Sequence, residues 1–223
     1  MVQENINVVK RGDRGREPLN IQKIHDMVEY AVEDIKGVSA SQVEMQSGLQ
    51  FYDGMSTDEI QQILIKSAAD LISLETPNYQ YVAARLLLYS LRKQVIDKLW
   101  DHPHIYDHTK KCIEKGVYDS SILNNYERKD FDRMENWINH NRDYDFTYAG
   151  LRQVIDKYLV QDRSSGEVFE TPQFMYMMIS ATLFAKYPKE KRMSYVKKYY
   201  DAISTYKINI PTPVMAGVRT PMR

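Results

Sequence analysis

The chain lacks the features that mark several common classes of protein. Its single cysteine, Cys112, excludes an internal disulfide framework. Lys plus Arg and Asp plus Glu number 30 each, so no net charge attracts a polyanion or an acidic membrane surface. The sequence has neither an early apolar signal segment nor an apolar run of about 18 residues, the length that spans a bilayer. We therefore expect no nucleic-acid or membrane partner, and a cytoplasmic location.

What the sequence does contain is enough apolar material for a folded core. Hydrophobic residues make up 43% of the 223 residues, which supports one to two domains. No internal repeat or low-complexity stretch interrupts this composition. The chain is therefore expected to fold as a globular protein. The helix patterns described next predict that it is mainly helical.

The N-terminal part combines a short hairpin with amphipathic helices. Apolar and β-branched residues at 6–10 and an extended piece at 17–19 flank a glycine-containing turn, which predicts two strands. Asn20 is placed as an N-cap and Gly37 as a stop for the helix between them. Apolar residues that recur every three or four positions, together with a capping box formed by Ser56 and Glu59, predict further helices. They cover 41–51, 56–72 with Ile60, Ile63, Leu64, Ala68, Leu71 and Ile72 inward, and 77–93 behind an N-cap at Thr76.

A change of composition at the HPH sequence of 102–104 indicates a linker. The segment 158–170 alternates in polarity around an SSG turn, which predicts a small second hairpin. Thr171 followed by Pro172 is typical of a helix start. The expected helices after the linker cover 106–115, 121–126, 130–139, 147–157, 172–186 and 189–205.

Lys10 and Arg11 stand where the first strand enters its glycine-containing turn. Side-chain cations and backbone N–H groups at such a turn can converge on phosphate oxygens. A solvated surface pair is the alternative, since charged residues are mostly exposed. The pair alone therefore does not identify a phosphate site.

Longer strings resemble a known family. NVVKRGDRGREPLNIQKI near the N-terminus and PTPVMAGVRTP near the C-terminus resemble the large (α) subunit of class I (Ia) ribonucleotide reductase. YQYVAARL, EKGVYD, KYLVQDR and ETPQFMY continue the resemblance in order. It implies an ATP cone over 1–95, a helical domain over 96–210, and a lead-in to the catalytic α/β barrel over 211–223, with the barrel itself absent.

The resemblance also implies site residues. The triphosphate would be held by Lys10, Arg11 and Lys93. ATP or dATP, with Mg²⁺ but no protein-bound metal, would further contact Glu17, Leu19, Asn20, Lys23, Ile24, Thr57 and Ile60. Thr212 would contribute to binding the substrate diphosphate. Some have simpler roles too: Asn20 is a good N-cap, Thr57 a good helix starter, and the two isoleucines fit the core stripe.

Two departures from the family pattern concern regulation by dATP. Gln61 stands where cones that respond to dATP often carry a histidine, and the RGDRGRE loop differs from the commoner arrangement. A glutamine lacks the switchable charge of histidine. We therefore expect dATP, if it binds, to inhibit weakly.

Catalysis in this family needs a cysteine that becomes a thiyl radical and a cysteine pair that delivers electrons. Cys112 matches none of these positions, and a lone helical cysteine is usually a small buried hydrophobe. No CxxC pair is present, which argues against the zinc-ribbon repressors that carry an ATP cone. His102, His104 and His108 raise a metal hypothesis, but no carboxylate or cysteine completes a tetrahedral set.

The function implied is that of the N-terminal portion of a thioredoxin- or glutaredoxin-dependent ribonucleoside-diphosphate reductase, which makes deoxyribonucleotides for DNA synthesis. Its implied partners are a large-subunit chain carrying the barrel and a radical-generating small (β) subunit. A split subunit of phage type, a truncated piece and an interrupted gene all fit the sequence. The rival is a freestanding nucleotide-sensing or interaction module, which has no reason to retain Thr212 and the VMAGVRTP segment.

Overall fold

The computed structural model describes residues 6–10, 15–48 and 50–221, and it is mostly helical with one short antiparallel hairpin. The chain divides into two compact units, residues 1–90 with 144–151 and residues 91–143 with 152–223. No helix among the described residues is both long and apolar enough to cross a membrane. The fold class therefore agrees with the mainly helical architecture expected from the sequence.

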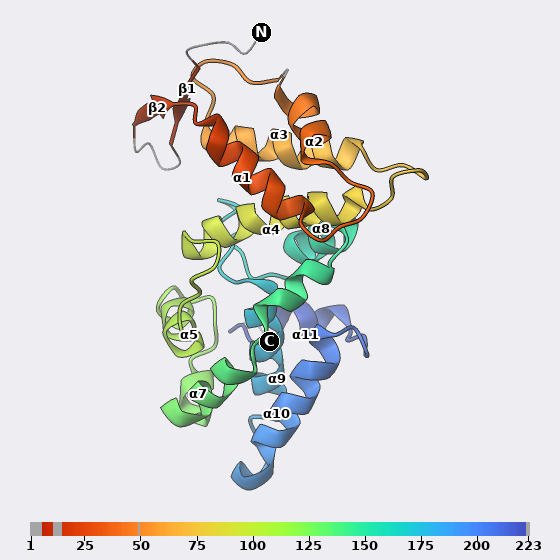
Figure 1. Ribbon diagram of the computed structural model, residues 1–223. Coiled ribbons are helices and arrows are strands. Elements are labelled where there is room, and N and C mark those ends of the chain that lie inside the picture. Colours follow the sequence, from red (N-terminus) through yellow and green to blue (C-terminus); the bar gives the residue numbers. More distant parts are fainter. Residues whose placement is uncertain (1–5, 11–14, 49, 222–223) are drawn as a thin grey trace. The chain divides into compact units, whose positions relative to one another are not determined.

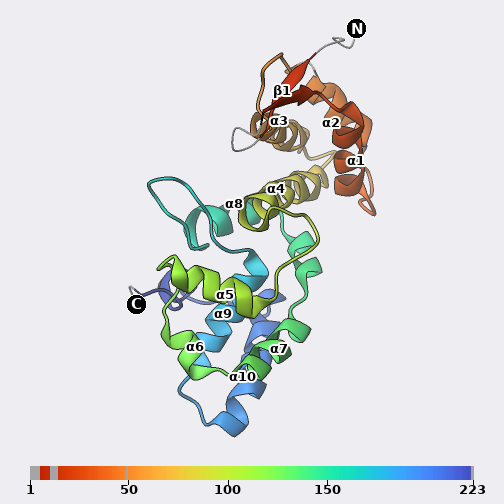
Figure 2. The same cartoon turned by 90° about the vertical axis from the view of Figure 1, so that its left-hand side faces the viewer.

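The first unit consists of the hairpin and the helices that follow it (Figures 1 and 2). Asn7 pairs with Pro18 and Val9 with Arg16 across the hairpin. Its elements are β1 (Asn7–Val9), β2 (Arg16–Pro18), α1 (Ile21–Val32), α2 (Ala40–Gly48), α3 (Thr57–Asp70), and the larger part of α4 (Tyr79–Ile96).

Local sequence explains where these helices begin. Asn20 accepts a hydrogen bond from the Lys23 amide at 3.1 Å and so caps α1. Ser56 and Glu59 form the predicted capping box at the start of α3. By contrast, the Thr76 hydroxyl donates to the Leu71 carbonyl, and α4 begins only at Tyr79.

Where helices end was predicted less well. Helix α1 ends at Val32 rather than near Gly37, because Asp34 takes a left-handed conformation with φ of 61°. Ile72, predicted to point inward from the next helix, lies beyond the end of α3 and is 39% exposed. Both errors arise because apolar periodicity continues past the point where the backbone turns away.

The second unit contains the end of α4 and most of the helices that come after it in the chain (Figure 2). Those that lie wholly within it are α5 (Ile105–Glu114), α6 (Ser121–Asn125), α7 (Arg128–Trp137), α9 (Pro172–Phe184), α10 (Lys189–Ser204) and α11 (Thr212–Gly217). A 3-10 helix (His140–Asp145) and α8 (Tyr148–Lys157) belong to it in part, through 140–143 and 152–157. α9 packs against α10, and α7 contacts both α5 and α10.

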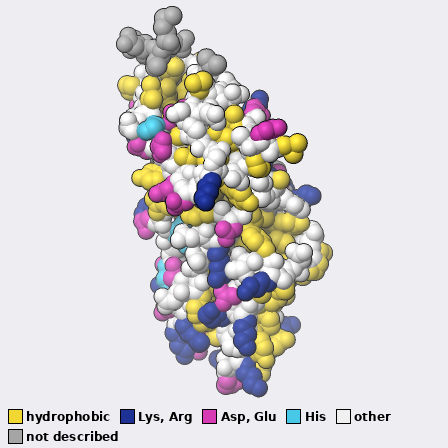
Figure 3. All heavy atoms as spheres, turned by 45° about the vertical axis from the view of Figure 1, so that its right-hand side comes forward, with side chains coloured by type: hydrophobic (Ala, Val, Ile, Leu, Met, Phe, Trp, Pro, Cys, Tyr) yellow, Lys and Arg dark blue, Asp and Glu magenta, His cyan; other side chains and the backbone are white. Residues whose placement is uncertain are grey.

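The core of this unit centres on α9, in which every residue from Pro172 to Ala181 is buried. Outside the core, Phe184 stacks with Tyr195, and Tyr187 and Tyr195 remain 46% and 39% exposed. Lys and Arg side chains gather beside hydrophobic ones where α10 lies (Figure 3). The helix is therefore anchored on one face and basic on the other.

The segment 158–170 turns back on itself as predicted, but its pairing is limited to a single antiparallel bridge between Gln161 and Val168. The Phe169 amide donates to the Val160 carbonyl, and the Asp162 amide to the Glu167 carbonyl. Thr212, which the resemblance places in the lead-in to the barrel, is the first residue of the short helix α11. The N-terminal proline rule explains the helix, since Pro213 is tolerated in a first turn.

Candidate functional site: the junction of the hairpin and α1

Lys10 lies directly after β1, at the entrance of the turn that closes the hairpin. Its amide donates to the Gly15 carbonyl at 3.0 Å, and Gly15 has φ of 96°, a conformation that glycine adopts without strain. Arg11, the other predicted phosphate ligand of this turn, lies outside the described residues. The turn therefore presents the Lys10 ammonium group beside β2.

Two of the predicted cations converge on one carboxylate. The Lys10 Nζ lies 2.7 Å from Glu17 Oε2, and the Lys23 Nζ lies 3.9 Å from Glu17 Oε1. The hydrogen bond from Lys10, together with the charges of both lysines, holds the pKa of Glu17 below its usual value. All three side chains are exposed enough for a ligand to reach them.

A hollow of about 480 Å³ lies at the junction of β2 and α1. This volume is within the usual range for a small-molecule site, about 300–1,000 Å³. Four of the residues predicted to contact the nucleotide border this hollow: Glu17, Leu19, Asn20 and Lys23. Its lining consists of Glu17, Pro18, Leu19, Asn20, Ile21 and Lys23.

The start of α3 is held beside the end of β1. The Val9 amide donates to the Met55 carbonyl at 2.9 Å, and Val9 forms a parallel bridge with Ser56. Thr57, the first residue of α3, therefore lies close in the fold to the residue that precedes Lys10. The first turn of this helix carries Asp58 and Glu59, whose carboxylates offset the partial positive charge of the helix N-terminus.

Asp53 has a positioning role that sequence reasoning missed. Its Oδ1 accepts from the Asn7 amide at 2.7 Å, which fastens the loop before α3 to β1. This hydrogen bond lowers the pKa of Asp53. The only signal in the sequence was the YDG turn, which predicts a break but not its partner.

The remaining residues predicted to contact the nucleotide do not border the hollow. Ile24 and Ile60 are 8% and 6% exposed and belong to the core of the first unit, as their simpler reading implied. Lys93 lies exposed in the last turn of α4, in the part of the helix that belongs to the second unit. Their contacts with a nucleotide remain predictions.

Gln61 is buried in the first unit and is already engaged. Its side chain is 8% exposed, and its Nε2 donates to the Leu86 carbonyl of α4 at 2.9 Å. The amide therefore ties α3 to α4. A side chain held in this way does not present a charge to a ligand.

The histidines of the second unit do not converge on a metal position. His104 caps α5 by accepting from the Tyr106 amide, His102 stacks on His140, and His108 packs against Phe174. Within the described part of the chain, no group of three His, Cys, Asp or Glu residues is arranged to hold a metal ion.

Cys112 is a buried residue of α5, as predicted from its helical position. It is 2% exposed, and burial raises the pKa of its thiol to about 12. The thiolate needed for nucleophilic or redox chemistry is therefore strongly disfavoured.

Two family profiles match separate parts of the chain. The ATP cone domain profile matches residues 6–94, and the profile of the ribonucleotide reductase all-alpha domain matches residues 144–223. The first match contains the hollow, with Lys23 in its lining, and also Lys10. The second contains α9, α10 and α11.

Similar proteins are α subunits of ribonucleoside-diphosphate reductases. The chain is 49% identical to the Haemophilus influenzae subunit and 48% identical to the Escherichia coli subunit 1, each over 220 residues. It is 41% identical to the Enterobacteria phage T4 subunit. These alignments cover 98–99% of this chain but only 28–29% of the relatives. The chain thus contains an ATP cone domain followed by a ribonucleotide reductase all-alpha domain, and over nearly its whole length it is similar to the N-terminal part of ribonucleoside-diphosphate reductase α subunits.

Proposed function

We propose that this chain is the nucleotide-regulated N-terminal portion of an enzyme that reduces ribonucleoside diphosphates. The observation that supports this most directly is the hollow bordered by Glu17, Asn20 and Lys23 beside Lys10, within the segment that matches the ATP cone. The all-alpha match over residues 144–223 favours this function over a freestanding sensor. A barrel-bearing chain and a radical-generating small subunit would complete the enzyme.

The residues present suit ATP as the regulatory ligand. The Lys10–Glu17 pair is exposed to solvent, where water and salt screen such pairs and leave them weak. A triphosphate therefore displaces the Glu17 carboxylate from Lys10 at little cost. Mg²⁺ would enter on the phosphate oxygens, which commonly supply much of its coordination in nucleotide sites.

Replacing Lys10 or Arg11 by Ala is expected to weaken ATP binding on the order of tenfold or more. Each substitution removes a charge-assisted hydrogen bond to phosphate, worth about 1.5–3 kcal/mol. Isothermal titration calorimetry of the whole chain with MgATP measures the change. Lys66→Ala removes an exposed lysine further along α3 and serves as the control. Unchanged affinity in both site variants would count against the site.

We expect dATP to inhibit the reconstituted enzyme only weakly. Gln61 is a neutral amide that is committed to the Leu86 carbonyl, so it offers no charged donor to the nucleotide. The measurement is an activity titration with ATP and with dATP, carried out in parallel on Gln61→His, which restores a titratable donor. Strong inhibition of the unsubstituted enzyme at low dATP would contradict the inference from this position.

A further inference from the structure

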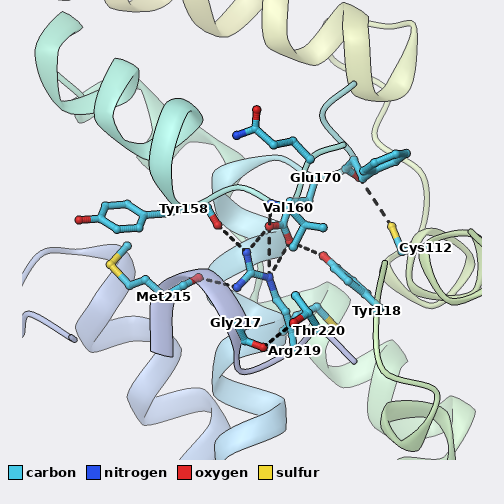
Figure 4. A network of polar contacts seen from close by, with 12 residues as sticks. Cys112, Tyr118, Tyr158, Val160, Glu170, Met215, Gly217, Arg219 and Thr220 are labelled. Atoms are coloured by element: carbon cyan, nitrogen blue, oxygen red, sulfur yellow. Dashed lines mark hydrogen bonds and ion pairs between the residues drawn. The ribbon is translucent and has the colours of Figure 1, made fainter. Parts of the chain in front are cut away.

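The second unit contains a buried ion pair that the nucleotide site does not involve. Arg219 and Glu170 are both fully buried, at 0% exposure. The Arg219 Nε lies 2.9 Å from Glu170 Oε2, and a guanidinium NH2 group also donates to Glu170 Oε1 (Figure 4). The pair is therefore bidentate, the geometry for which the planar guanidinium is suited.

Arg219 also binds two backbone carbonyls. It donates to the Met215 carbonyl at 2.6 Å and to the Tyr158 carbonyl at 2.9 Å. Its own carbonyl accepts from the Asp119 amide at 2.9 Å. The Arg219 side chain therefore joins α11 to the segment after α8. The Arg219 backbone carbonyl joins the same part of the chain to the loop after α5.

Glu170 is equally engaged on the other side of the pair. It accepts from the Tyr118 hydroxyl and from the Val160 amide, the latter at 2.7 Å. Burial and the adjacent Glu170 carboxylate raise the pKa of Tyr118, so its hydroxyl stays protonated and remains a donor. The carboxylate is therefore also held by two residues that precede α9, in addition to its contacts with Arg219.

Apolar burial does not explain how α11 is held. None of the six described residues of this helix is buried, and Thr212 at its start is exposed. Arg219, two residues after the helix, is the buried member of the segment. The helix is therefore attached mainly through a charged network whose geometry is directional.

We infer that Arg219 is a positioning residue: its bidentate pair with Glu170 fixes α11, and with it Thr212, on the second unit. This inference rests on the proposed function, together with the role in binding the substrate diphosphate that the family resemblance implies for Thr212. A buried ion pair is often no more stabilising than an apolar pair of similar size. Its distinguishing property is directional geometry, which a segment that carries a substrate contact requires.

The first test measures hydrogen–deuterium exchange of the peptide covering 211–221 in the whole chain. Amides of Met215, Val218 and Thr220 donate within this segment and report its order. Arg219→Lys keeps the positive charge but loses the planar guanidinium group that binds both Glu170 oxygens. We therefore expect hydrogen exchange in this peptide to accelerate at least tenfold. Arg142→Lys, which alters the Arg142–Asp201 pair elsewhere in the unit, is the matched control and should leave the peptide unchanged.

A double variant separates positioning from general stability. Arg219→Met leaves Glu170 buried without its partner, so a lowered melting temperature is expected. Adding Glu170→Gln removes that buried charge; the glutamine oxygen can still accept from the Val160 amide, and its NH2 group can donate to the Tyr118 hydroxyl oxygen. We expect the melting temperature to recover substantially while exchange of 211–221 stays fast. Unchanged exchange in Arg219→Lys, or exchange that returns to normal in the double variant, would overturn the inference.

The second test uses the enzyme assembled with the barrel-bearing chain and the small subunit. For Arg219→Lys we expect a several-fold higher KM for the ribonucleoside diphosphate, a smaller change in kcat, and unchanged ATP binding. A change confined to kcat would refute the link to the substrate diphosphate. If the assembly without substitutions has no activity, the proposed function fails, whereas the exchange experiment still decides whether Arg219 holds α11.

Discussion

Purified by itself, the chain is expected to reduce no ribonucleoside diphosphate. The proposed reaction needs a thiyl radical and a reducing pair of cysteines, whereas the sequence supplies Cys112 alone. That thiol is buried in α5 with a pKa of about 12. No conformation of the chain resembling this fold therefore offers the required chemistry.

Turnover is expected when the chain is combined with a polypeptide carrying the barrel and with the radical-generating small subunit. Val214, Met215 and Val218 are only half-buried in and beside α11, which leaves apolar surface for the barrel to cover. An interface that completes a domain should be large and obligate in character. Co-expression, copurification and a CDP-reduction assay measure association and activity together.

Cys112→Ala provides the control for this experiment. Because the thiol lies in the core and matches no catalytic position, the variant should support turnover as well as the unsubstituted chain does. Activity of the chain without the second polypeptide would contradict the proposed function. Failure of the two polypeptides to associate would contradict the split-subunit proposal.

The second unit is expected to lose stability steeply between about pH 6.5 and pH 4. Burial lowers the pKa of His102 and His108 to about 4 and that of His140 to about 3, compared with 6.5 when unfolded. Between these values the unfolded chain binds protons that the folded chain does not. The stability contributed by neutral histidines is therefore present above pH 6.5 and is lost as the pH falls.

Asp143 opposes this effect in part. Burial raises its pKa to about 6, so the folded carboxyl binds a proton at a higher pH than the unfolded one does. Its contribution increases stability as the pH falls from 6 towards 4. The three histidines outweigh the one carboxyl, so the free energy of unfolding falls between pH 6.5 and pH 4. The net loss is on the order of 2–4 kcal/mol after solvent screening at the partly exposed rings.

Urea titrations at several pH values test this expectation. Trp100 and Trp137 both belong to the second unit, so their fluorescence follows its unfolding. The His102 and His140 rings stack at 3.5 Å, and both His140 nitrogens are buried without a hydrogen bond to any described residue. His140→Phe should therefore keep the stacking while reducing the dependence on pH.

His104→Asn is the control, since it removes a histidine outside the stacked pair and preserves an N-cap at the start of α5. The stability that this variant loses between pH 6.5 and pH 4 should match the loss in the unsubstituted chain. If stability between pH 6.5 and 4 is flat, or if His140→Phe leaves the slope unchanged, the stacked histidines do not cause the effect.

Short-range rules predicted most of the helices and the turn at which Lys10 stands. The N-cap at Asn20 and the capping box of Ser56 and Glu59 are contacts between residues three apart, so the local sequence contains all that they need. The same locality placed Lys10 at the turn and Glu17 and Lys23 around one hollow. The resemblance named their expected roles in nucleotide binding, and those roles remain predictions.

The tertiary structure alone decided the long-range polar partners. Gln61 meets the Leu86 carbonyl 25 residues away, and Arg219 meets Glu170 across 49 residues. Hydrophobic periodicity carries no signal for such pairs, because each forms only when folding excludes water from groups that must then bind one another. The sequence by itself therefore determined the helices, the caps and the residues near the hollow, while burial in the folded chain decided which polar side chains became fixed in place.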